Sequence, residues 1–126
     1  MKTALDLVAE ARFHITEIPL AAAEDAIHDA DVLIDVREPE EYQAGHIPGA
    51  LLIPRGLLEF KIGMDADLAP RDTRIVLYCK TSGRATLCAH ALQQMGYHHV
   101  KSIAGGFDAW QASGRAVITL TTPRFD

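Results

Sequence analysis

The sequence has few cysteines, no excess of basic residues and no long apolar stretch, and each lack excludes a class of protein. Its two cysteines, Cys79 and Cys88, are too few for a disulfide scaffold and suit a reducing compartment. With 12 Lys and Arg against 17 Asp and Glu, the net charge is −5, which argues against a nucleic-acid partner. No apolar run approaches the roughly 20 residues that span a bilayer, so we expect no membrane partner.

The sequence also lacks a secretory signal and a metal-binding pattern. Asp6, Glu10 and Arg12 interrupt any apolar segment near the first residue, so we expect a soluble cytoplasmic protein. The six histidines stand at positions 14, 28, 46, 90, 98 and 99, and none has metal-ligand spacing with a cysteine or a carboxylate pair. We therefore predict neither a metal nor another cofactor.

Short apolar segments alternate with helical ones along the 126 residues, which suffice for one domain with one core. The apolar runs predict strands at 14–18, 32–36, 50–53, 75–79 and 99–103. The helical patterns fall at 3–12, 21–29, 39–43, 57–61, 84–95 and 107–112, and a β-prone piece follows at 117–122. This alternation predicts a parallel sheet with helices on both faces, whose ligands bind beyond the carboxyl ends of the strands.

The stretch VLYCKTSGRAT (76–86) sets a cysteine at the tip of a predicted strand, before a short cationic loop and a helix. We expect the backbone amides from Lys80 to Arg84 to curl around the sulfur of Cys79, with Gly83 allowing a positive φ in the curl. The helix N-terminus and the two cations would stabilise a thiolate, which is the reactive form of cysteine. The pattern thus predicts an anion cradle around a nucleophile, and the alternative is a buried strand-end cysteine beside a helix cap.

Three motifs in this order resemble the rhodanese superfamily: LIDVREPEEYQAGHIPGA at 33–50, CKTSGR at 79–84 and AGGFDAW at 104–110. The resemblance covers residues 14–115 and leaves a helical extension at 1–13 and a tail at 116–126. It implies an α/β domain of three layers, with a central five-stranded, mostly parallel sheet flanked by helices. It also implies a sulfurtransferase that takes sulfane sulfur from thiosulfate or a persulfide donor and passes it to cyanide, a thiol or a protein acceptor.

By the same resemblance, Cys79 is the nucleophile that carries the sulfur as a persulfide. The loop that holds the persulfide and the anionic donor consists of Lys80, Thr81, Ser82, Gly83 and Arg84. The chain departs from the pattern Cys-x-x-Gly-x-Arg-Ser, which many active single-domain members have, because it places Ser82 at the glycine and Ala85 at the final serine. Thr81 or Ser82 could supply the hydroxyl that Ala85 lacks.

Other residues near the site are expected to act mainly through structure. The resemblance gives Asp35 and Arg37 the role of tying a strand end to the adjoining loops. His46 fixes a turn before a strand in preference to a catalytic role. Arg55 follows the third strand and is either a contact for an anionic donor or an ordinary exposed arginine. Cys88 lies on the apolar face of its helix, where a buried small hydrophobe is favoured over a resolving thiol.

Two further segments adjoin the predicted site. Gly105 and Gly106 open a helix near the loop, where we expect part of the pocket rim. A solvated acidic face is expected at Glu38, Glu40 and Glu41.

Two other functions compete with sulfur transfer. Cysteine phosphatases and arsenate reductases on a related fold have sites that resemble Cys-x5-Arg, whereas four residues separate Cys79 from Arg84 here. The shorter loop makes a smaller ring of amides, which suits one sulfur atom better than a tetrahedral oxyanion. The other alternative is a partner-binding module without catalysis, against which the presence of Cys79 argues. A persulfide carrier that serves one protein partner stays compatible with the sequence.

Overall fold

The fold is a parallel sheet between two helical layers, seen in a computed structural model that describes residues 1–120. The strands are β1 (Thr16–Ile18), β2 (Val32–Asp35), β3 (Leu51–Leu52), β4 (Arg74–Tyr78) and β5 (His99–Ile103). They lie in the order β1-β5-β4-β2-β3, and every neighbouring pair is parallel. The expectation of a three-layer α/β domain with a five-stranded sheet is confirmed.

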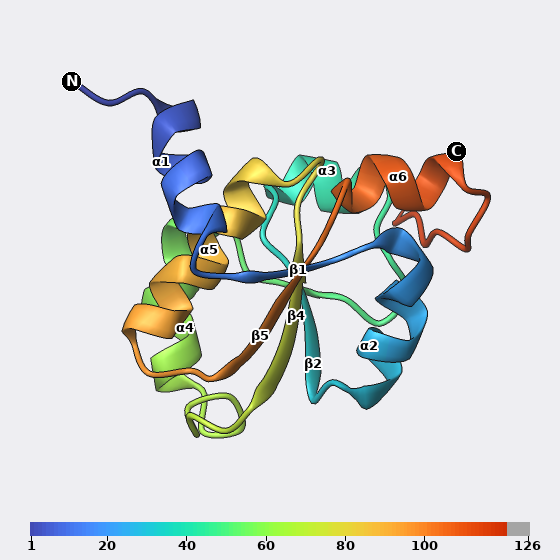
Figure 1. Cartoon of the computed structure of the whole chain (residues 1–126). Coiled ribbons are helices and arrows are strands. Elements are labelled where there is room, and N and C mark those ends of the chain that lie inside the picture. Colours follow the sequence, from blue (N-terminus) through green and yellow to red (C-terminus); the bar gives the residue numbers. More distant parts are fainter. Residues whose placement is uncertain (121–126) are drawn as a thin grey trace.

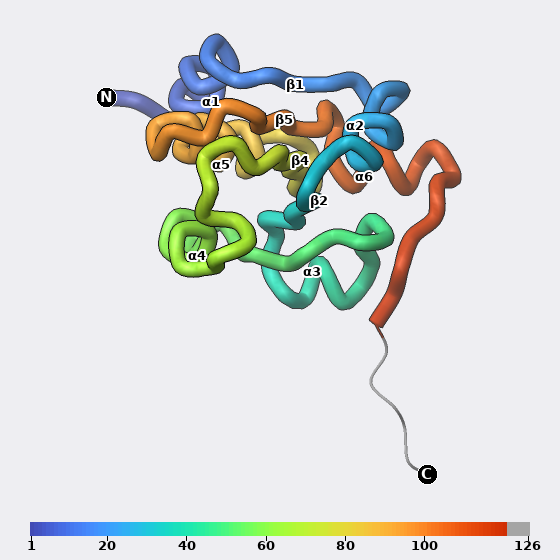
Figure 2. The backbone as a smooth tube through the Cα atoms, turned by 90° about the horizontal axis from the view of Figure 1, so that it is seen from below, coloured from blue at the N-terminus to red at the C-terminus, as the bar shows by residue number. Residues whose placement is uncertain are grey.

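Helices cover both faces of this sheet. They are α1 (Ala4–Arg12), α2 (Ala23–Asp29), α3 (Pro39–Ala44), α4 (Leu58–Met64), α5 (Gly83–Gln94) and α6 (Gly106–Ala112), with short 3-10 turns at η1 (Leu20–Ala22) and η2 (Arg55–Leu57). Figure 1 shows α1, α4 and α5 on one side of the sheet and α2 and α6 on the other. The view from below in Figure 2 separates the same two groups of helices. Within residues 1–120, no helix combines the length and the apolar character needed to cross a membrane.

The apolar run of β4 is continuous because both faces of this central strand are buried. Ile75 and Leu77 belong to the core cluster that also contains the buried apolar residues of α4 and α5. Val76 and Tyr78 alternate with them and join the cluster beneath α2 and α6. Cys79 continues the alternation on the α5 side, so its side chain faces the helix that follows it.

The N-terminal helix α1 packs on the domain through α5. It begins at a capping box, in which the amide of Asp6 donates to Thr3 Oγ1 at 3.1 Å and the amide of Thr3 donates to Asp6 Oδ2 at 2.9 Å. Ala11 is buried on its inner side. Just beyond the helix, the ring of His14 stacks on that of His90 in α5, with the centroids 4.9 Å apart.

Most boundaries shift by one or two residues from those predicted. The strand expected at 50–53 is reduced to Leu51 and Leu52. In the tail, Ile118 forms an isolated antiparallel bridge with His46, and the predicted β-prone piece at 117–122 runs beyond the described residues.

Candidate active site

The sulfur of Cys79 lies at the N-terminus of α5. Cys79 follows β4 and is 1% exposed, and the amide of Ala85 donates a hydrogen bond to its Sγ at 3.4 Å. Ala85 is the third residue of α5. In an ordinary helix its amide would donate a hydrogen bond to the side chain of the N-cap residue, which is Ser82 here. Ser82 makes no such bond, so the sulfur takes the place of the capping oxygen. The helix N-terminus therefore faces the sulfur and favours negative charge on it.

The backbone path of the loop differs from the predicted one at Gly83. Its φ is not positive, because Gly83 already has helical geometry as the first residue of α5. The expectation of a positive φ there is wrong. Gly83 lies beneath α1 instead, where an added Cβ would stand 3.7 Å from Val8 Cγ2. The amide contact to the sulfur comes from Ala85, which follows the five residues expected to supply it.

The first turn of α6 holds the outer side of the loop. The amide of Phe107 donates to the carbonyl of Cys79 at 2.8 Å. Gly106 has φ +54°, and a Cβ there would lie 2.5 Å from Thr81 O and 2.9 Å from Lys80 O. Only glycine fits this close approach. The amides of α6 thus bind the carbonyl groups of the loop, while the amide of Ala85 faces the sulfur.

Both cations of the loop form ion pairs. Arg84 binds Glu41 in a bidentate pair, with Nη1–Oε1 at 2.7 Å and Nη2–Oε2 at 3.0 Å, and Lys80 Nζ lies 2.7 Å from Asp108 Oδ2. The hydrogen bonds from Arg84 lower the pKa of Glu41 from 4.5 to about 2, and those to Glu41 raise the pKa of Arg84. Glu41 is half-buried and also accepts from the amide of Glu38. The expectation that it belongs to a solvated face is wrong, because a partner distant in the sequence reaches it.

Asp35 and Arg37 form a buried ion pair at the end of β2. The carboxylate of Asp35 accepts from Arg37 Nη2 at 2.8 Å, from Nε at 3.1 Å and from the Arg37 amide at 2.9 Å. Arg37 also donates from Nη2 to the carbonyl of Gly45 at 2.6 Å, and its guanidinium lies 4.3 Å from the ring centroid of Phe107. Since the amide of Phe107 binds Cys79, the pair connects the end of β2 to the segment that holds the loop.

Two predicted site residues have their contacts elsewhere. His46 is buried, with Nδ1 2.9 Å from the carbonyl of Tyr42 and its ring stacked on the Tyr42 ring at 3.7 Å. Arg55 is exposed and lies near Cys88. Burial raises the pKa of the Cys88 thiol to about 12, and Arg55 partly opposes the rise. Within residues 1–120, no hydrogen bond joins the side chain of His46 or Arg55 to the loop.

Arg12 reaches the loop from α1, a contact that the sequence did not suggest. Its Nη2 donates to Ser82 Oγ at 3.2 Å across 70 positions of the chain. No local pattern signals such a pair. The amide of Ala85 was also missed, although its place in the first turn of the predicted helix could have revealed it.

Comparisons with known proteins concern most of the chain. The family model of the rhodanese-like domain matches residues 20–113. A sulfurtransferase of Allochromatium vinosum is 32% identical over 99 residues, which cover 79% of this chain and 84% of that protein. The thiosulfate sulfurtransferase GlpE of Pseudoalteromonas translucida is 33% identical over 98 residues, which cover 76% of this chain and 89% of that protein.

A solved structure from Rhodopseudomonas palustris is similar over nearly the whole chain. It is 30% identical with a TM-score of 0.82, and the match covers 94% of this chain and 96% of the other. That protein is described as one of unknown function and a possible tyrosine phosphatase.

Proposed function

Since the chain belongs to the rhodanese-like domain family, we propose that it is a sulfurtransferase in which Cys79 carries the transferred sulfur as a persulfide. The family and the two relatives named as sulfurtransferases support sulfur transfer in general. The observation that carries the finer proposal is the hydrogen bond from the Ala85 amide to Cys79 Sγ at the N-terminus of α5. A group placed there is stabilised when it bears negative charge.

In the first step, the thiolate of Cys79 attacks the outer sulfur of thiosulfate. A new S–S bond forms at Sγ, the S–S bond of thiosulfate breaks, and sulfite leaves with the electron pair. The product is a persulfide anion on Cys79, so the charge on the protein does not change. The amide of Ala85 already points at the sulfur and needs little reorganisation as the charge moves outward.

In the second step, a nucleophile removes the outer sulfur from the persulfide. Cyanide attacks it and leaves as thiocyanate, or a thiolate attacks it and leaves as a new persulfide. Each reaction breaks the S–S bond and returns the electron pair to Cys79. A small thiol and a cysteine of a protein partner both satisfy this chemistry.

A donor reaches the sulfur only after some rearrangement around it. Cys79 is 1% exposed, whereas Lys80 and Thr81 on the outer loop are exposed. Because hydrogen bonds hold the backbone of Cys79 and Lys80 to α6, we expect a movement of side chains around the sulfur to admit the donor. A buried sulfur is reached more easily by a donor whose reactive sulfur is terminal, as it is in thiosulfate.

Phosphatase chemistry is the alternative raised by the description of the similar structure from Rhodopseudomonas palustris. Arg84 is engaged with Glu41 through both Nη atoms, which removes the cation that a tetrahedral oxyanion would need beside the cysteine. We therefore expect negligible hydrolysis of p-nitrophenyl phosphate. Robust phosphatase turnover without sulfur transfer would favour the alternative.

The decisive experiment is intact-mass analysis after incubation with thiosulfate. We expect the native protein to gain one sulfur atom and to lose it on addition of cyanide. Cys79→Ser should gain none and should release no thiocyanate, whereas the control Cys88→Ser should behave as the native protein. Sulfur uptake by the Cys79 variant, or its loss in the Cys88 variant, would contradict the assignment.

A further inference from the structure

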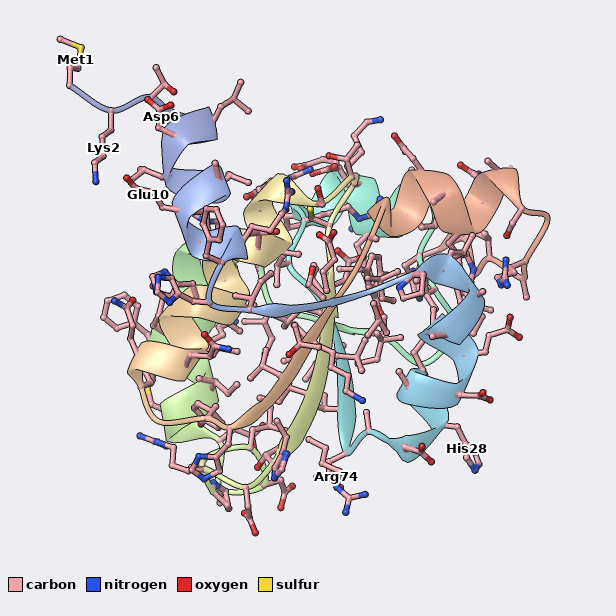
Figure 3. The ribbon with its side chains drawn as sticks, viewed as in Figure 1. Met1, Lys2, Asp6, Glu10, His28 and Arg74 are labelled. Carbon is pink, nitrogen blue, oxygen red and sulfur yellow. The ribbon has the colours of Figure 1, made fainter. Side chains whose placement is uncertain are left out.

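The N-terminal helix α1 lies outside the family match at 20–113 and yet contacts the loop of the proposed active site. Its inner side places Val8 over Gly83 and Arg12 on Ser82. Figure 3 shows Lys2 and Glu10 on the outer side of the helix, where they form an ion pair at 2.8 Å. The helix therefore presents one cation to the loop and keeps its other charges in solvent.

The hydroxyl of Ser82 is available to Arg12 because it does not cap α5. The amide of Ala85, which an N-cap side chain would bind, already donates to Cys79 Sγ. Ser82 Oγ accepts from Arg12 Nη2 at 3.2 Å instead. Arg12 therefore contacts the residue that precedes α5, and Cys79 Sγ accepts from the third residue of the same helix.

In the described part of the chain, Arg12 also keeps a free Nη donor, whereas both Nη atoms of Arg84 bind Glu41. Lys80 and Arg84 are paired with Asp108 and Glu41. Arg12 forms a looser ion pair, with Nε 3.8 Å from Glu17 Oε2 and no hydrogen bond between them, and its side chain is 48% exposed. Its Nη1 makes no hydrogen bond within residues 1–120 and can bind an anion from solvent.

We propose that Arg12 is a specificity-determining residue that binds the anionic end of the sulfur donor at the mouth of the loop. Ser82 holds the guanidinium there, and the outer sulfur of the donor reaches Cys79 while its sulfonate or carboxylate contacts Arg12. The substrate class is thus a small anionic sulfane donor. This inference rests on the proposed sulfur transfer and assigns a function to the extension that precedes the family match.

Steady-state kinetics with thiosulfate and cyanide test the contact. For Arg12→Ala we expect the KM for thiosulfate to rise about fivefold, the effect of one charged contact at a half-exposed site, with kcat within about twofold of native. Arg12→Lys keeps the charge and should recover part of the loss. The control is Arg74→Ala, which removes the same charge at the start of β4, the end of the sheet remote from Cys79 (Figure 3). We expect its KM to equal the native value.

A second measurement separates anion binding from sulfur transfer. We compare the alkylation rate of Cys79 by iodoacetate, an anion, with that by neutral iodoacetamide, using mass spectrometry to locate the product. The rate with iodoacetate divided by the rate with iodoacetamide should fall about threefold in Arg12→Ala and should keep its native value in Arg74→Ala. In 1 M salt, where the Debye length is about 3 Å, the native protein and Arg12→Ala should give the same ratio.

Each outcome decides one question. A native protein that transfers no sulfur but shows the change in ratio would overturn the proposed function and leave the anion contact standing. Sulfur transfer with an unchanged ratio in Arg12→Ala would overturn the role of Arg12, even if KM changed, because a merely loosened α1 would affect both alkylating agents equally. If Arg12→Ala does not fold, Arg12→Gln replaces it in both assays with the same expectations.

Discussion

Removing Asp35 should destabilise the domain through the charge that it leaves behind. In Asp35→Ala, the buried guanidinium of Arg37, whose side chain is 4% exposed, loses its contacts at 2.8 and 3.1 Å and retains the carbonyl of Gly45, and the Arg37 amide loses its bond at 2.9 Å. Breaking a buried ion pair on one side costs about 3–5 kcal/mol, a large part of the roughly 5–15 kcal/mol that stabilises a domain. Urea unfolding followed by far-ultraviolet circular dichroism measures the loss of free energy.

The matched control removes both charges of the pair. Asp35→Leu combined with Arg37→Met leaves no uncompensated charge, so we expect it to be more stable than Asp35→Ala by about 2 kcal/mol or more. Asp35→Asn keeps the shape of the side chain and should lie between them. The reasoning fails if Asp35→Ala costs less than about 1 kcal/mol, or if the double variant is as unstable as the single one.

Two further predictions concern the loop and its ion pair. Gly106→Ala should reduce the free energy of unfolding by about 2 kcal/mol or more and abolish most persulfide formation, because φ is +54° and the added Cβ meets the loop carbonyls. Gly83→Ala should stay within about 0.5 kcal/mol of native in the same urea unfolding experiment, and equal losses in the two variants would contradict this. Glu41 has a pKa of about 2 instead of 4.5, so its contribution to stability is present above pH 4.5 and disappears as the pH falls toward 2. Unfolding of Glu41→Gln across this window should depend less on pH than that of the native protein, and identical slopes would refute the pairing.

The sheet and the place of Cys79 could be predicted because each depends on a local pattern. The run at 75–79 is apolar at every position, as a central strand buried on both faces requires, and the structure gives β4 at Arg74–Tyr78. The helix that follows shows its periodicity within its own 12 residues. Such features can be predicted without knowing which distant residues they contact in the folded chain.

The pairing of charges could not be predicted in this way. Arg84 and Glu41 are 43 positions apart, and Arg12 and Ser82 are 70 apart, so only the folded chain brings them together. The error at Gly83 has a similar origin. A glycine in a loop is compatible with a positive φ or with a close neighbour, and α1 supplies the neighbour.

Because α6 binds the loop through its amides, we expect that the loop cannot be exchanged alone with the loop of a relative. The carbonyls of Cys79 and Lys80 accept from the amides of Phe107 and Asp108 at 2.8 and 3.0 Å, and Gly106 leaves room for them. A chimera that receives only the loop at 79–84 from another protein therefore combines it with an α6 that evolved against a different loop. Recombination should succeed when 104–110 comes from the same parent, so the two segments form one module for design although about twenty residues separate them in the chain.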